Sequence, residues 1–129
     1  MNALLRSLIA LFIIAHGLVH PILSIVPDNE VENAPVGTFW NSSWLLGEST
    51  FVKRAIYILS GLSALLFLLA GLSFAGWLLP VVWWRGLWVA GAGLSAFLLV
   101  VFWHPWFVIG LVIDALMLAF VLVPGPLPE

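Results

Sequence analysis

The sequence predicts an all-α integral membrane protein, with four transmembrane helices in up-down topology. The chain is 64% hydrophobic and 8% charged, with a mean hydropathy of +1.20, whereas soluble domains carry about 25% charged residues. Its apolar residues form long runs, and about 20 such residues cross the ~30 Å hydrocarbon core of a bilayer. A chain of 129 residues leaves no room for a separate soluble domain, so we expect residues 1–129 to form a single transmembrane domain.

The charge composition narrows the possible partners. The net charge of −2 comes from four basic and six acidic residues, which argues against binding to nucleic acid. The chain has no cysteine, which excludes disulfides, thiolate metal sites and covalent haem attachment. The lipid bilayer is therefore the first partner that the composition predicts.

The first predicted span covers residues 3–26. Arg6 lies near its start, and His16, His20 and Pro21 lie in its second half. Its apolar run is longer than that of a typical signal peptide, and no Ala-x-Ala cleavage site follows it. We therefore expect this segment to be retained as a transmembrane helix.

Residues 28–50 form the one long polar stretch and are expected to connect the first two spans. Four of the six acidic residues lie here, namely Asp28, Glu30, Glu32 and Glu48. The stretch also contains Phe39, Trp40 and Trp44. Because aromatic side chains favour the headgroup level of a bilayer, we expect a loop with a short interfacial segment between the first two helices.

The second span is expected at about residues 55–73, after the capping residues Ser49 and Thr50. The third is expected at about residues 81–103, because Pro80 suits the start of a helix. Tryptophans 83 and 84, with the arginine that follows them, suit the membrane interface at this start.

The stretch from Trp84 to Val123 is too long for one membrane crossing at ~1.5 Å per residue. Between Gly86 and Val123 it carries a single formal charge, Asp114. The sequence His104-Pro105-Trp106 interrupts it, and proline does not continue a helix. The fourth span is therefore expected at residues 106–123.

Four spans place both termini on the same side of the membrane. Cations in the short connections are balanced, with Arg6 and Arg85 on the terminal side and Lys53 and Arg54 on the other. The N-terminal amine shifts this balance toward cytoplasmic termini, since cytoplasmic segments carry the excess of positive charge. We expect the inner or plasma membrane of a cell as the location.

Small residues gather on the second and third predicted spans. Gly86 and Ala90 are four residues apart, as are Gly91 and Ser95. This spacing lets helix backbones approach closely in lipid, where no hydrophobic drive brings helices together. We expect these residues to pack within the chain rather than to form a dimer interface.

Four ionisable residues make up the candidate site, namely His16, His20, His104 and Asp114. His16 lies ~15 Å and His20 ~9 Å from the end of the first span at Val26. Asp114 lies ~12 Å from the start of the fourth span on the same side, and His104 lies at that edge. Because a carboxylate inside a membrane needs a partner, the matched depths predict a hydrogen bond between Asp114 and His16.

These residue types leave two kinds of cofactor site open. Haem b would need His16 or His20 on one face and His104 on the other. A quinone or lipid needs only a groove between helices, a hydrogen-bonding histidine or aspartate, and aromatic walls. His16 and His20 have the spacing of the HExxH motif, but they lack its glutamate and a third ligand, so no metal site is expected. No Ser-His-Asp arrangement is present, so no catalytic residue is predicted.

Two functions follow from these observations. The first is a non-catalytic accessory or structural subunit of a larger membrane complex, with other membrane protein subunits as partners. The second is a quinone- or haem-binding membrane redox protein that uses His16, His20 and Asp114, with His104 as a further candidate ligand. In the first case the pair of His16 and Asp114 is a structural clasp, and in the second it is part of a functional centre.

Overall fold

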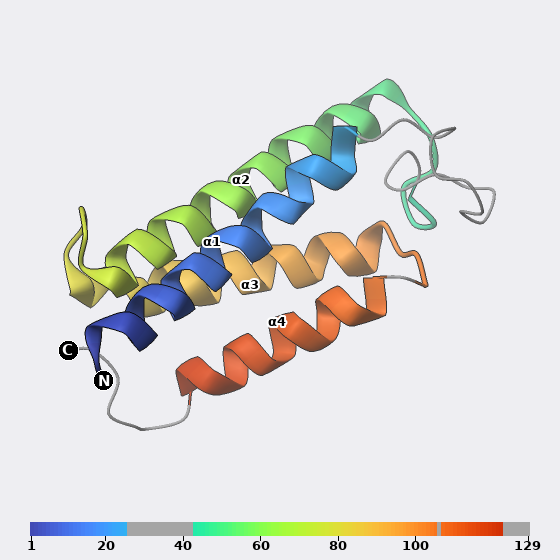
Figure 1. Ribbon diagram of the computed structural model, residues 1–129. Helices are drawn as coiled ribbons and strands as arrows, with labels where there is room; N and C mark the ends of the chain where they lie inside the picture. Colours follow the sequence, from blue (N-terminus) through green and yellow to red (C-terminus); the bar gives the residue numbers. More distant parts are fainter. Residues whose placement is uncertain (26–42, 106, 123–129) are drawn as a thin grey trace.

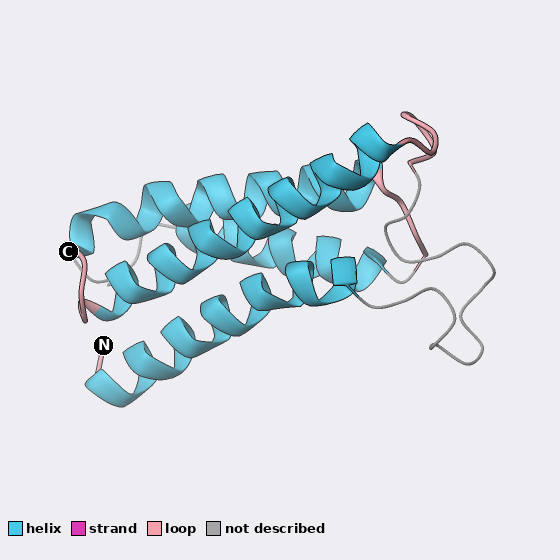
Figure 2. Ribbon diagram, turned by 90° about the horizontal axis from the view of Figure 1, so that it is seen from above, coloured by secondary structure: helices cyan, strands magenta, loops and turns pink. Residues whose placement is uncertain are grey.

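The computed structural model describes residues 1–25, 43–105 and 107–122. Within these residues the chain forms four α-helices and one short 3-10 helix, η1, at the start of the third. The elements are α1 (Ala3–Ile25), α2 (Thr50–Ala75), η1 (Val81–Trp83), α3 (Trp84–Val101) and α4 (Phe107–Leu122). Successive helices run in opposite directions along one long axis (Figure 1), and Figure 2 shows the same arrangement from above.

Among the described residues, three helical segments are long and apolar enough to cross a membrane. They are Ala3–Ile25, Thr50–Ala75 and Val81–Val101. The fourth helix is apolar but shorter, because its 16 residues extend only ~24 Å. Pro105 precedes it and Pro124 follows it in the sequence, which limits its length. The part of the chain that the structure describes is therefore all-helical and contains three membrane-span candidates.

Capping residues set the ends of α2. It begins at Thr50, earlier than expected, because Ser49 Oγ accepts a hydrogen bond from the Val52 amide at 3.1 Å. It ends at Ala75 and is capped by Gly76, whose φ of 69° lies in the left-handed region that favours glycine. The third helix ends at Val101, two residues before the expected end.

Residues 43–49, the described part of the predicted loop, fold against the end of α3. Ser43 and Gly47 form an isolated antiparallel bridge. Ser43 Oγ donates to the Val101 carbonyl and Trp44 Nε1 to the Val100 carbonyl, both at 2.7 Å. These bonds satisfy carbonyl groups that the end of a helix leaves unpaired. Residues 28–42, including Phe39 and Trp40, lie outside the described residues.

The helices pack in chain order, with α1 on α2, α2 on α3 and α3 on α4. Gly71 allows the close approach of α1, since a Cβ there would lie 2.8 Å from the Ala10 carbonyl oxygen. Gly91 lies against the Phe67 ring from α2, and Ser95 is fully buried. These two residues pack within the chain as expected.

The expectation of packing within the chain is wrong for Gly86 and Ala90. Both lie on the outer face of α3, and a Cβ at Gly86 would meet no atom within 4 Å among the described residues. Gly93 shares this exposed face. The residues four apart share a face as predicted, but the rotation of α3 turns this pair outward.

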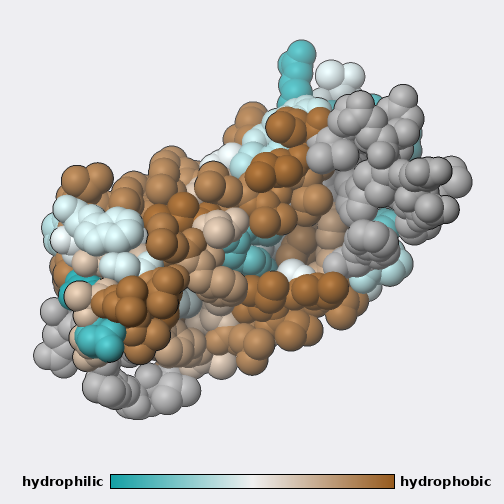
Figure 3. Space-filling view, in the orientation of Figure 1, coloured by the Kyte–Doolittle hydropathy of each residue, from teal (hydrophilic) through white to brown (hydrophobic). Residues whose placement is uncertain are grey.

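Large hydrophobic side chains cover much of the exterior. Examples at least half exposed occur on all four helices, including Leu4 on α1, Ile58 on α2, Phe97 on α3 and Ile109 on α4. Figure 3 shows one such face, mostly brown, with a small hydrophilic area near its centre. Water does not favour a surface of this kind, so the exterior is consistent with membrane localisation.

Candidate functional site

Buried polar side chains from three helices meet in the interior of the protein. His16 and His20 come from α1, Ser95 from α3 and Asp114 from α4. His16 Nε2 lies 2.9 Å from Asp114 Oδ1, Ser95 Oγ lies 2.6 Å from Asp114 Oδ2, and Ser95 Oγ lies 2.8 Å from His20 Nε2. The four side chains therefore form one continuous hydrogen-bonded network, His16–Asp114–Ser95–His20.

The single proton of the Ser95 hydroxyl sets the direction of this network. Ser95 donates it to Asp114 Oδ2, so His20 Nε2 must be the donor to Ser95 Oγ. His16 Nε2 then donates to the other carboxylate oxygen of Asp114. Asp114 is 1% exposed and accepts one hydrogen bond on each oxygen, which offsets the free energy of burying a carboxyl group.

Helix α2 contributes an aromatic support to the two histidines. The Phe67 ring is fully buried and lies 5.2 Å from the His16 ring and 6.2 Å from the His20 ring, between centroids. Gly17 on α1 and Gly91 on α3 leave the space for this ring, since a Cβ at either position would press against Phe67. All four helices therefore help to position the two imidazoles.

The predicted hydrogen bond between Asp114 and His16 is present. Ser95, which joins His20 to the same carboxylate, was expected only as a small packing residue. The sequence signal that could have identified Ser95 is its expected depth in the membrane. Ser95 lies eight residues before Trp103, the expected end of its span, which places it ~12 Å from that end. That is the depth expected for Asp114, at the same side of the membrane.

His104 lies in the connection between α3 and α4. Its backbone carbonyl accepts a hydrogen bond from the Phe107 amide at 2.8 Å, and its ring lies 5.7 Å from the Phe107 ring. These contacts place it at the first turn of α4, at the end of the bundle. The candidate residues thus divide into His16, His20 and Asp114, which share one network, and His104, which supports the start of a helix.

A cavity of about 260 Å³ lies beside this network, between α1 and α4. Its lining side chains come mainly from these two helices, with one from α3, and they are His16, Val19, His20, Leu23, Leu99, Phe107, Ile109, Gly110 and Ile113. Among these described lining residues the two imidazoles are the polar ones. A pocket that is mostly apolar with a few fixed polar groups is typical of small-molecule sites.

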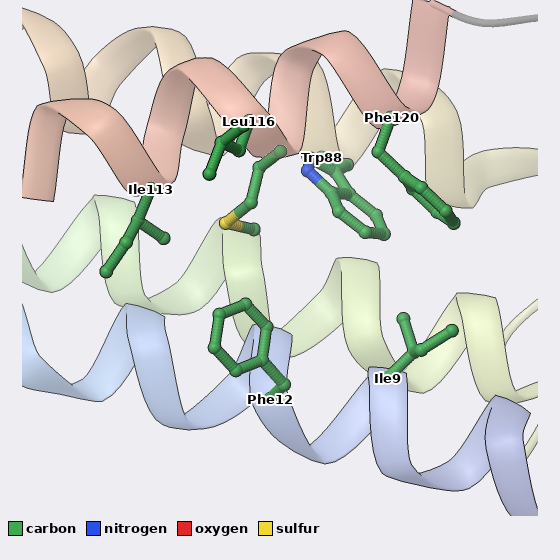
Figure 4. A pocket seen from close by; sticks show the side chains of 7 residues that line it. Ile9, Phe12, Trp88, Ile113, Leu116 and Phe120 are labelled. Atoms are coloured by element: carbon green, nitrogen blue, oxygen red, sulfur yellow. The ribbon is translucent and has the colours of Figure 1, made fainter.

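A second cavity of about 260 Å³ follows along the same gap, toward the start of α1. Figure 4 shows its lining, in which Ile9 and Phe12 from α1 face Ile113, Leu116 and Phe120 from α4. Trp88 from α3 and Met117 from α4 complete it. Every lining side chain is apolar or aromatic, and Ile113 lines both cavities.

The two halves of the gap also share an aromatic contact. Phe12, in the apolar cavity, stacks on the His16 ring at 6.4 Å between centroids.

Within the described residues, no group of three or more histidine, cysteine, aspartate or glutamate side chains is arranged to hold a metal ion. No protein-family model, curated protein or solved structure matches the chain.

Proposed function

We propose that this is a membrane protein that binds a lipophilic molecule with a polar ring, of the quinone class, between α1 and α4. The observation that carries the proposal is the position of His16 and His20. Both imidazoles line the cavity, and both are held by hydrogen bonds to buried groups on other helices. A ligand would therefore meet hydrogen-bonding groups that are already oriented.

The imidazole of His16 suits both redox forms of such a ring. Its Nε2 atom is hydrogen-bonded to Asp114, so Nδ1 is the ring nitrogen that can form a hydrogen bond with a ligand. In the neutral tautomer Nδ1 accepts a hydrogen bond, as a quinol hydroxyl requires, and in the imidazolium it donates one, as a quinone carbonyl requires. The hydrogen bond between Nε2 and Asp114 holds the ring in one orientation in both forms.

The same geometry favours a quinone over haem b. The Nε2 atoms of His16 and His20 are each hydrogen-bonded, to Asp114 and Ser95 respectively. Iron ligation through either atom would break one of these bonds. His104, the expected second ligand, lies at the first turn of α4 rather than in the network.

We also propose that α4 forms a fourth membrane span. A helix of ~24 Å is shorter than the hydrocarbon core, but a bilayer thins locally around such a helix at modest cost. Asp114 lies at the middle of α4 and bonds to His16 well inside α1, which supports a common depth. The start of α1 and the end of α4 then share one membrane face, for which we propose the cytoplasmic face of an inner or plasma membrane.

Binding of the ubiquinone ring without its tail, measured by calorimetry on the protein in lipid nanodiscs, tests this function. We expect binding to the wild type and at least tenfold weaker binding in both His16→Ala and His20→Ala. His104→Ala is the matched control and should bind as the wild type does. Equal binding by all four proteins, or no binding by any of them, would contradict the proposal.

A non-catalytic accessory subunit of a larger membrane complex is the second candidate function. The exposed face of α3 favours it, because Gly86, Ala90 and Gly93 would let a partner helix approach closely. Purification in mild detergent should then recover membrane protein partners in fixed ratio. Gly86→Leu and Gly93→Leu should release them, whereas Val112→Leu, at an exposed position of α4, should not.

A further inference from the structure

The gap between α1 and α4 has a polar half and an apolar half. Along α1, the residues that line it run from Ile9 to Leu23, which is fourteen residues or ~21 Å. The imidazoles belong to the half nearer the end of α1, and Trp88 and Phe120 belong to the other half. Ile113 lines both, so the two cavities are adjacent at this side chain.

We infer that the ligand is amphipathic, with its polar ring beside His16 and His20 and an apolar tail in the cavity beside Trp88. This inference rests on the proposed function, since it extends the same molecule along the same gap. The two cavities are adjacent at Ile113 and lie in the same gap between α1 and α4, which supports one elongated occupant rather than two. The second cavity is lined by apolar groups apart from the indole N–H of Trp88, which is buried and has no hydrogen-bond partner among the described residues, and this lining supports a mainly hydrocarbon occupant.

Packing, rather than hydrophobic transfer, would hold the tail in this position. A hydrocarbon chain gains no hydrophobic free energy when it leaves lipid for an apolar cavity. Here it would lie against aromatic faces, because the Trp88 and Phe120 rings stack at 5.6 Å between centroids with planes 26° apart. Met117 lines the same cavity, and its flexible thioether side chain adapts to irregular shapes.

Trp88 provides a local reporter for the tail. Its side chain is only 2% exposed and lines the cavity, so a tail in this cavity would lie against the ring. A quinone ring with a decyl tail brominated at its far end should therefore quench the fluorescence of Trp88. We expect this quenching in the wild type and its loss in Trp88→Phe, with the unbrominated probe as the reference for both proteins.

Substitution at the junction of the cavities tests the route of the tail. Ile113→Phe enlarges the side chain that lines both halves, whereas Val112→Phe enlarges its neighbour, which lines neither and is 52% exposed. At saturating probe, where affinity does not affect the result, Ile113→Phe should reduce the quenching by at least half. Val112→Phe should leave it as in the wild type.

Different outcomes would overturn the inference and the proposed function. If the tailless ring binds but the brominated tail quenches the wild type and Trp88→Phe equally, the tail lies in lipid and the inference is wrong. If neither probe binds, the proposed function fails as well. A photoreactive diazirine at the end of the tail tests the same point without substitutions, since it should label Ile9–Phe12 and Leu116–Phe120 and not the exposed face of α3.

Discussion

The Nε2 atom of His16 lies 2.9 Å from Oδ1 of Asp114, a contact between residues 98 positions apart in the chain. It joins α1 and α4, the first and last helices, across the gap that contains both cavities. Gly110, one turn before Asp114, approaches Leu99 of α3, and a Cβ there would lie 2.9 Å from a Leu99 methyl group. The position of Asp114 thus depends on contacts with α1 and α3 together.

A double-mutant cycle on His16→Ala and Asp114→Ala should give a coupling free energy of about 0.5–2 kcal/mol, the range found for hydrogen bonds between membrane helices. Reversible unfolding in mixed micelles, followed by circular dichroism, measures it. The matched cycle pairs His104→Ala with Asp114→Ala and should give no coupling, because His104 lies at the first turn of α4. Equal coupling in both cycles would show that the bond adds nothing specific.

Two buried serines should respond in opposite ways to substitution by alanine. Ser95→Ala breaks the link between His20 and Asp114 and should destabilise the protein by about 1–3 kcal/mol, since it leaves buried polar atoms without a partner. Ser63 on α2 is also fully buried, but its hydroxyl has no hydrogen-bond partner among the described residues. Ser63→Ala should therefore be neutral or stabilising in the same unfolding measurement.

Affinity for the quinone ring separates the role of Ser95 in positioning His20 from its role in stability. Ser95→Ala should weaken binding about threefold to tenfold, the effect of one hydrogen bond, although Ser95 does not line the cavity. Ser63→Ala should leave affinity unchanged. Wild-type affinity in a folded Ser95→Ala protein would mean that His20 needs no support from Ser95.

Alanine substitutions at two glycines on α2 should have different effects on stability, because one glycine lies in a close helix contact and the other on an open surface. At Gly71 a Cβ would lie 2.8 Å from the Ala10 carbonyl oxygen on α1, so Gly71→Ala should destabilise the protein by about 1–3 kcal/mol. At Gly61 a Cβ would meet no described atom within 4 Å, so Gly61→Ala should stabilise α2 by up to about 1 kcal/mol. Thermal unfolding in detergent compares the two variants. Equal effects would contradict the packing of α1 on α2.

The absence of cysteine allows the fourth span to be tested by labelling of single cysteines. Asn2→Cys and Leu122→Cys should react with a membrane-impermeant maleimide from the same side, and Glu48→Cys from the opposite side. The residues lie at the ends of α1, α4 and α2 respectively, and all three are exposed. Labelling of Leu122→Cys together with Glu48→Cys would mean that α4 does not cross the membrane.

Hydropathy by itself was enough to predict the four helices, three of which are long and apolar enough to cross a membrane, because long apolar runs can be read from the order of residues without knowledge of contacts. Residue spacing also predicted how far His16 and Asp114 lie from the ends of their helices, since each residue adds a constant rise along a helix. Matched depth was enough to predict their hydrogen bond. The predicted boundaries were less accurate, because the local cap at Ser49 starts α2 before its apolar run begins.

Only the tertiary structure decided how each helix is rotated about its own axis. This rotation turns Ser95 and Gly91 inward and Gly86 outward, although all three are small residues of α3. It depends on the fit of the Phe67 ring between Gly17 and Gly91, which are 74 residues apart in the chain. Helical periodicity shows which residues share a face, but the neighbouring helices determine which face is buried.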